Sequence, residues 1–236
     1  MNGRYERNIG AITEAEQELL LKKRAAIVGC GGLGGYIAEF LARLGLGHLT
    51  LIDGDAFTVS NLNRQILSLE TNLGKNKALE AKKRLSAFRS DLYIEAIDTF
   101  LNDDNAADLL KGHDIILDAL DNVQTRLLIE KTAGILGIPL VHGAVEGWCA
   151  QVCTVFPGDL ILSMLYSTNR ESERQSSAEK PRSIENAPSV LSFAPAFCAS
   201  LQTSEAVKVL LNKENVLRKK LLSVDMKSCV FEIIGL

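Results

Sequence analysis

The feature that most constrains this chain is a glycine-rich turn between an apolar run and a helical pattern. Residues 25–28 are uniformly apolar, and residues 29–34 satisfy the spacing Gly-x-Gly-x-x-Gly. From 33 to 44 the apolar side chains recur at helical spacing. Glycine allows the tight turn and lets phosphate approach the backbone, and the start of a helix offers unpaired N–H groups. The segment therefore predicts a nucleotide site, for ATP or NAD, at Gly29, Gly31, Gly32 and Gly34.

Apolar runs alternate with helical patterns as far as Trp148. Such alternation, with uniformly apolar strands, indicates a parallel sheet that helices cover on both faces. The predicted strands are 25–28, 49–52, 92–97, 114–117 and 139–142, and the predicted helices are 13–23, 33–44, 75–88, 105–110 and 123–136.

The pattern changes after Trp148. Residues 150–156 alternate like an antiparallel strand, 195–211 predict a helix, and 221–225 with 229–234 predict a closing hairpin. We therefore predict an α/β fold of the doubly wound, Rossmann-like class, with a mainly parallel sheet and antiparallel C-terminal strands. We expect residues 1–236 to form a single domain, made of an N-terminal segment (1–24), a nucleotide-binding core (25–148) and a sheet-closing part (149–236). Within the last part, 166–188 is expected to be a long polar loop.

Composition is that of an ordinary globular protein. The chain has 236 residues, of which 47% are hydrophobic and 23% charged, and its formal net charge is −3. Nucleic-acid binding needs clustered Lys and Arg, so a weakly acidic balance argues against it. The polar start predicts no signal peptide, and no stretch approaches the roughly 20 consecutive apolar residues of a membrane span. Because the five cysteines form no paired framework, we expect reduced thiols and a cytoplasmic location.

A polar segment follows the second predicted strand. Asp53 ends that strand, where an acidic side chain can accept hydrogen bonds from ribose hydroxyls. Arg64 offers a planar set of donors suited to phosphate oxygens, and Lys77 adds a point charge. The alternative is that both cations are solvated surface groups. We expect a polyphosphate site here, with the candidate residues Asp53, Asp55, Asn61, Arg64, Gln65 and Lys77.

Asp121 and Asn122 follow the predicted strand at 114–117, at the edge where open α/β sheets bind ligands. Asp121 could hold Mg²⁺, which commonly uses one or two carboxylates together with substrate phosphates. Alternatively, Asp121 or Asn122 only caps the helix that begins at Val123, and Asn122 could do both.

Together these segments resemble the MoeB/ThiF/HesA family, the bacterial relatives of ubiquitin-activating enzymes. The shared motifs are Gly-x-Gly-Gly-Leu-Gly, Asp-x-Asp, Ser-Asn-Leu-x-Arg-Gln, Gly-x-x-Lys and Asp-x-x-Asp-Asn, in order and at matching spacing. The start at 4–7 resembles the family's Arg-Tyr-x-Arg, and 200–208 and 224–225 resemble its late helix and closing strands. The resemblance spans nearly the whole chain and is most specific from Arg4 to Asn122.

The resemblance implies a definite activity. Such enzymes use ATP and Mg²⁺ to activate the C-terminal carboxylate of a ubiquitin-fold sulfur-carrier protein ending in Gly-Gly, which gives an acyl-adenylate and pyrophosphate. By matching motifs, Gly32 would approach the phosphates, Asp53 the ribose, and Asp121 the metal. Arg7 matches an arginine that reaches the neighbouring subunit's site, so the resemblance also implies a homodimer. The residues implied to carry the reaction are Arg7, Asn61, Arg64, Lys77 and Asp121.

Three other interpretations fit part of the pattern. A nicotinamide-dependent oxidoreductase would use the glycine turn and Asp53 but would leave Arg64, Lys77 and Asp121 without a role. An inactive relative that only binds a ubiquitin-like partner would not need those three side chains. A family member that adenylates a carboxylate on modified tRNA fits the net acidity of the chain poorly.

The cysteines set this chain apart from the sulfur-transferring members of the family. The stretch 166–188 contains no cysteine that could form a thioester or persulfide, Cys198 lies in an apolar run, and Cys30 lies within the glycine turn. We therefore expect the chain to stop at the adenylate, with a separate sulfurtransferase to deliver sulfur.

The cysteines also depart from the pattern of zinc-binding members, which carry two Cys-x-x-Cys pairs. The matching stretches here, 160–167 and the residues after Phe231, contain no cysteine. Cys149 and Cys153 have a different spacing and lack a second pair, so we expect both to be buried structural thiols.

Elemental analysis of the purified protein tests this expectation. We predict no stoichiometric zinc, because four ligands for a tetrahedral structural site are not available. One zinc ion per chain would contradict the prediction.

Overall fold

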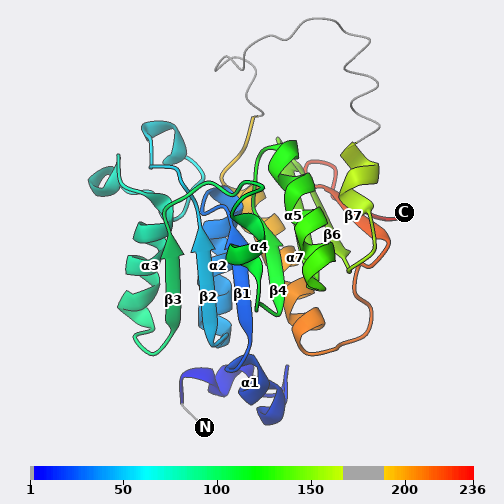
Figure 1. Cartoon of the computed structure of the whole chain (residues 1–236), viewed down its shortest axis with the longest axis horizontal. Helices are drawn as coiled ribbons and strands as arrows, with labels where there is room; N and C mark the ends of the chain where they lie inside the picture. The colour runs from blue at the N-terminus through cyan, green and yellow to red at the C-terminus, as the bar shows by residue number, and fades with distance from the viewer. Residues whose placement is uncertain (1–2, 167–188) are drawn as a thin grey trace, which may run out of the picture.

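Uniformly apolar strands form the centre of the structure. In the computed structural model, which describes residues 3–166 and 189–236, they join one eight-stranded sheet in the order β3-β2-β1-β4-β5-β6-β7-β8 (Figure 1). The parallel strands are β1 (Arg24–Val28), β2 (His48–Ile52), β3 (Tyr93–Ile97), β4 (Ile115–Asp118) and β5 (Leu140–Glu146). The antiparallel strands are β6 (Cys149–Val155), β7 (Lys220–Asp225) and β8 (Val230–Gly235). The predicted fold class is confirmed.

Helices cover both faces of this sheet. One face carries α2 (Gly32–Leu44), α3 (Lys77–Phe88) and α7 (Phe193–Leu210), and the other carries α4 (Ala106–Leu110) and α5 (Val123–Leu136), which lie in front in Figure 1. Successive residues of a strand face opposite sides. Accordingly, Ala25 and Ile27 of β1 join one hydrophobic core, and Ala26 and Val28 join the other.

The N-terminal segment packs at the amino ends of the strands. It consists of η1 (Gly3–Asn8) and α1 (Glu14–Leu20), which starts with the predicted Thr13–Glu16 capping box. The Tyr5 side chain is buried, and the buried Arg89 guanidinium lies over its ring and donates to the Ala42 carbonyl at 3.0 Å. This anchoring fixes the segment at the end of the sheet opposite the glycine turn.

Several element boundaries differ from the predicted ones. The α3 helix begins at Lys77 because Asn76 caps it by accepting from the Leu79 N–H at 3.0 Å, while the Lys75 carbonyl accepts from the Phe57 N–H. The irregular segment 54–72 contains two short 3-10 helices, η2 (Val59–Asn61) and η3 (Glu70–Asn72). Most of the predicted loop 166–188 lies outside the described residues, and residues 161–166 before it are helical.

The strand order reverses between β1 and β4, which are neighbours although two other strands come between them in the chain. In open α/β sheets, ligands bind at the carboxyl ends of the strands at such a reversal. The glycine turn follows β1 and the Asp121 segment follows β4, so the topology brings both to this point.

The same substitution at two isoleucines tests the packing. Ile37 of α2 is 0% exposed and Ile135 of α5 is 74% exposed. We predict that Ile37→Ala lowers the free energy of unfolding by about 2–5 kcal/mol, because it leaves a cavity in the core. Ile135→Ala should change it by less than about 0.5 kcal/mol. Urea denaturation measures both, and equal effects would contradict the described burial.

Candidate active site

Two glycines of the turn are required by the packing of the chain itself. Gly29 has φ +95°, and a Cβ there would lie 2.6 Å from the Ala119 carbonyl oxygen. A Cβ on Gly34 would lie 1.8 Å from the Gly29 carbonyl oxygen. These glycines allow the turn to fold back onto the start of α2 and to touch the segment after β4.

The other two glycines have more room. A Cβ on Gly31 would lie 3.4 Å from the Gln65 side chain, and one on Gly32 would lie 3.4 Å from Pro195, which are ordinary contact distances. In the described part of the chain, no side chain caps the start of α2 at Gly31. The first N–H groups of a helix need acceptors from outside it. The turn therefore suits a phosphate that approaches closely at 31 and 32.

Asp53 connects the glycine turn to the next loop. Its carboxylate accepts from the Cys30 N–H at 2.6 Å and from the Asp55 N–H at 2.8 Å. Burial raises the pKa of Asp53, and the two backbone hydrogen bonds oppose that shift. Lys77 is buried and pairs with the exposed Asp55 carboxylate at 2.9 Å. Three of the predicted segments, the glycine turn, the Asp53–Asp55 segment and Lys77, are thus linked side by side at the carboxyl edge.

The Asn-Leu-x-Arg-Gln segment lies against the turn. Arg64 is half-buried, and its guanidinium donates to the Ser60 carbonyl and the Asn63 side chain, both at 2.8 Å. The buried Asn61 accepts from the Thr58 N–H at 3.0 Å. Gln65 is buried beside Gly31, and its Oε1 has no hydrogen-bond partner among the described residues. A buried acceptor without a donor suits a ligand that supplies one.

Asp121 and Asn122 follow β4. Asn122 accepts from the Thr125 N–H at 2.8 Å, so the capping interpretation is confirmed for Asn122. The Asp121 side chain is exposed, two residues after the Ala119 carbonyl that touches the glycine turn. In the parts of the chain that the structure describes, no group of three or more His, Cys, Asp or Glu side chains gathers as a metal site. A cation at Asp121 would therefore need oxygen ligands from the substrate or water.

Arg7 does not join these residues within one chain. It is exposed on η1, at the amino ends of the strands, whereas the glycine turn lies at their carboxyl ends (Figure 1).

Sequence reasoning missed a buried polar network behind the Asp121 segment. The carboxylate of Asp118 is fully buried and accepts from His142 Nδ1 at 2.6 Å. The network also includes Arg126 and Tyr166, whose hydroxyl lies 3.2 Å from His142 Nε2. Asp118 and His142 are direct partners in the register of β4 and β5, and the one signal in the sequence was a polar residue at the end of each apolar strand.

The cysteines follow the predictions with one exception. Cys30, Cys153 and Cys198 are buried, and burial raises the pKa of Cys153 and of Cys198 to about 12, so both stay protonated. The predicted burial of Cys149 is wrong. It is exposed because β6 begins there, directly after the turn from β5. Cys229 is also exposed.

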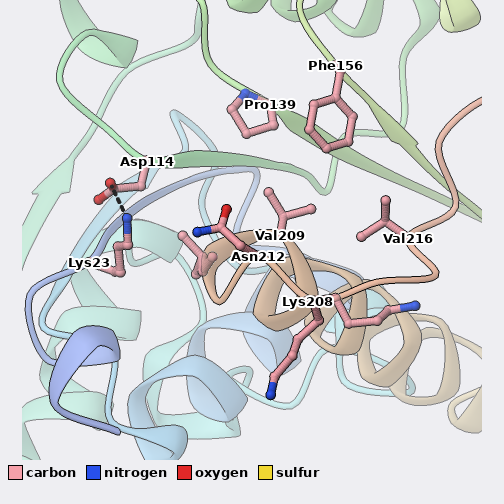
Figure 2. Close-up of a pocket in the computed structure, with 10 residues that line it drawn as sticks. Lys23, Asp114, Pro139, Phe156, Lys208, Val209, Asn212 and Val216 are labelled. Atoms are coloured by element: carbon pink, nitrogen blue, oxygen red, sulfur yellow. Dashed lines mark hydrogen bonds and ion pairs between the residues drawn. The ribbon is translucent and has the colours of Figure 1, made fainter. Parts of the chain in front are cut away.

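Two cavities lie away from the glycine turn. The one in Figure 2, about 340 Å³, lies at the amino ends of the strands, where Lys23 pairs with Asp114 at 3.0 Å beside Pro139 and Phe156. The other, about 510 Å³, lies against α5.

The fold defines a protein of the doubly wound, Rossmann-like α/β class. The sequence matches the ThiF family over residues 5–234, and the chain belongs to that family. It is 34% identical over 220 residues to a sulfur carrier protein adenylyltransferase of Thermus thermophilus, covering 91% of this chain and 79% of that protein. It is 30% identical over 235 residues to the SAMP-activating enzyme E1 of Haloferax volcanii, covering 98% of this chain and 84% of that protein.

Solved structures share the fold. PaaA superposes with a TM-score of 0.82 at 23% identity, covering 100% of this chain and 84% of that chain. E. coli MccB in complex with AMPCPP and MccA superposes with a TM-score of 0.83 at 22% identity, covering 99% of this chain and 71% of that chain. In the described residues, no helix is long and apolar enough to cross a membrane.

Two alanine substitutions separate the two kinds of glycine. Gly32→Ala should fold normally and weaken ATP binding by about tenfold or more, because the added methyl group occupies the space for phosphate. Gly34→Ala should lower the free energy of unfolding by about 1–3 kcal/mol, because its methyl group overlaps the Gly29 carbonyl. Calorimetric titration and urea denaturation measure the two effects. Unchanged ATP affinity in Gly32→Ala would show that the nucleotide does not approach this backbone.

Proposed function

We propose that this chain is an adenylyltransferase that uses ATP to activate the C-terminal carboxylate of a ubiquitin-like sulfur-carrier protein. The proposal rests on one observation. A helix N-terminus without a side-chain cap, the cations Arg64 and Lys77 and the carboxylate of Asp53 gather where the strand order reverses, in a chain that belongs to the ThiF family. The names of its relatives, an adenylyltransferase for a sulfur carrier and an activating enzyme, support the same class.

The chemistry needs positioning and charge neutralisation rather than a base. A C-terminal carboxylate has an ordinary pKa of about 3.5, so it is already ionised at neutral pH. One carboxylate oxygen forms a bond to the α-phosphorus, and the bond from that phosphorus to the oxygen bridging to the β-phosphate breaks. Pyrophosphate leaves with that electron pair, and the acyl-adenylate remains. The barrier comes from bringing two anions together.

The residues at the carboxyl edge have matching tasks. The N–H groups at Gly31 and Gly32 would bind phosphate oxygens, and Asp53 would accept from the ribose. Arg64 would turn from the Ser60 carbonyl onto the phosphates. Each of these groups already lies at the turn and needs only a local rearrangement.

Lys77 and Asp121 complete the charge balance. Lys77 would shift from the Asp55 carboxylate toward the phosphates. Asp121 would hold Mg²⁺, whose charge offsets that of the polyphosphate. Asn61, Gln65 and Asn122 would line the same site, and the buried Gln65 Oε1 could accept a hydrogen bond from the nucleotide.

An apolar surface beside the turn fits the carrier protein. Trp148 and Phe193 are 43% and 42% exposed, their ring centroids lie 4.9 Å apart, and Leu191 is 37% exposed. Phe193 begins α7 two residues before Pro195, which lies next to Gly32. Exposed aromatic side chains grouped at one place are typical of protein–protein contacts. A carrier bound here would be close enough to extend its C-terminus to the glycine turn.

Arg7 supports a homodimer in the proposed function. Because it lies at the opposite end of the sheet from the glycine turn, it would reach an active site only from a second subunit. Cys30, Cys153 and Cys198 are buried, and the exposed Cys149 and Cys229 lie outside the stretch 166–188, which contains no cysteine. We therefore propose that a separate sulfurtransferase supplies sulfur. A cytoplasmic location would suit the reduced thiols.

The rival functions gain no support. The relatives named above are not oxidoreductases or tRNA-modifying enzymes by name. An inactive binding protein would not need Arg64, Lys77 and Asp121 beside an open glycine turn.

Arg64→Ala and Asp121→Ala test the proposal. Each should lower carrier-dependent ATP–pyrophosphate exchange by at least about a hundredfold, because each removes charge that stabilises the transition state. The carriers to test are a panel of ubiquitin-fold proteins that end in Gly-Gly. Arg43→Ala on α2 and Asp108→Ala on α4 are matched controls at exposed positions and should keep full activity. Near wild-type exchange in either site variant would contradict the assignment.

A further inference from the structure

A network of hydrogen bonds among four side chains lies behind the proposed site. Arg126 Nη1 donates to the Tyr166 hydroxyl oxygen at 2.7 Å, and that hydroxyl lies 3.2 Å from His142 Nε2. Burial raises the pKa of the Tyr166 phenol, so the hydroxyl keeps its proton. His142 Nδ1 lies 2.6 Å from the Asp118 carboxylate and donates to it, because a carboxylate only accepts. The His142 ring therefore joins Tyr166 to Asp118.

Asp118 and Arg126 of this network form hydrogen bonds with the backbone just before Asp121. Asp118 Oδ1 accepts from the Leu120 N–H at 3.0 Å, and Arg126 Nη2 donates to the Leu120 carbonyl at 2.5 Å. Both polar groups of one loop residue are therefore held. The preceding carbonyl, that of Ala119, touches Gly29 of the glycine turn. The network thus holds Leu120, the residue that joins this contact to Asp121.

Stability of the fold alone does not require these charged side chains to be buried. Asp118 and His142 are 0% and 1% exposed, and Arg126 approaches the same carboxylate at 3.6 Å. Replacing such a buried charged cluster with apolar side chains of similar volume is often neutral or stabilising. The hydrogen bonds here end on the loop before Asp121 rather than within the core. Outer partners that orient a metal-binding carboxylate have this arrangement.

We propose that His142 is a positioning residue: by holding Asp118 against Leu120 it keeps Asp121 at the geometry that adenylation needs. The inference rests on the proposed function for its effect on activity. It also predicts a rigid loop in the free protein, which can be measured without substrate.

His142→Leu breaks both hydrogen bonds of the ring at similar volume. We expect kcat for carrier-dependent exchange to fall about ten- to one-hundredfold, with KM for ATP changing less than about threefold, and the Mg²⁺ concentration at half-maximal rate to rise about tenfold. His142→Asn keeps a donor near the Nδ1 position and should retain at least about a third of the wild-type kcat. Leu85→Ala, a core change on α3, controls for lost stability.

Hydrogen exchange in the free protein gives the second readout. In His142→Leu the amides of residues 119–122 should exchange at least about tenfold faster, while Leu85→Ala leaves them within about threefold of wild type. If His142→Leu fails to fold, Tyr166→Phe replaces it: the variant removes only one hydroxyl group, and it should speed the same amides at least about fivefold, beyond the range of Leu85→Ala.

The two arms separate two kinds of failure. Wild-type protein without carrier-dependent exchange would overturn the proposed function, and the amide measurement would still decide the positioning role. Unchanged kcat and Mg²⁺ dependence in His142→Leu, or amides no faster than in Leu85→Ala, would overturn the role of His142.

Discussion

The close backbone contact between the glycine turn and the segment after β4 is the constraint on which the rest of the site depends. Gly34 allows the turn to lie against the Gly29 carbonyl, and Gly29 in turn touches the carbonyl of Ala119. Any side chain at 29 or 34 would push the two loops apart. The backbone at Gly31 and Gly32 meets its neighbours only at ordinary contact distances, and no described side chain caps the start of α2.

The free site holds its charges in balanced local contacts. Lys77 pairs with Asp55, Arg64 is held by the Ser60 carbonyl, and Asp53 accepts from the glycine turn. Such contacts keep the cations near the turn without burying an unpaired charge, which would be costly. A polyphosphate that arrives can replace the weaker partners. The side chains are thus close to their working positions, and little conformational entropy remains to be lost on binding.

Much of the fold could be predicted because its central strands β1, β2 and β4 are buried on both faces and are mainly apolar. The positions of the glycine turn and of the polar segment after Asp53 were also predictable, since each follows a buried parallel strand and the carboxyl ends of these strands meet at one edge of the sheet. Side-chain contacts between distant segments could not be predicted from the sequence. The pairing of Asp118 with His142 depends on the register of β4 and β5. The exposure of Cys149 depends on the residue at which β6 begins. The position of Arg7 depends on how Tyr5 packs against Arg89, which no local pattern encodes.

A crystal structure with a non-hydrolysable ATP analogue and Mg²⁺ tests the central claim most directly. We predict that the Arg64 guanidinium leaves the Ser60 carbonyl and contacts a phosphate oxygen, and that the Asp121 carboxylate lies among the metal's oxygen ligands. The phosphates should lie on the backbone at Gly31 and Gly32. A bound nucleotide from which Arg64 and Asp121 both point away would contradict the account.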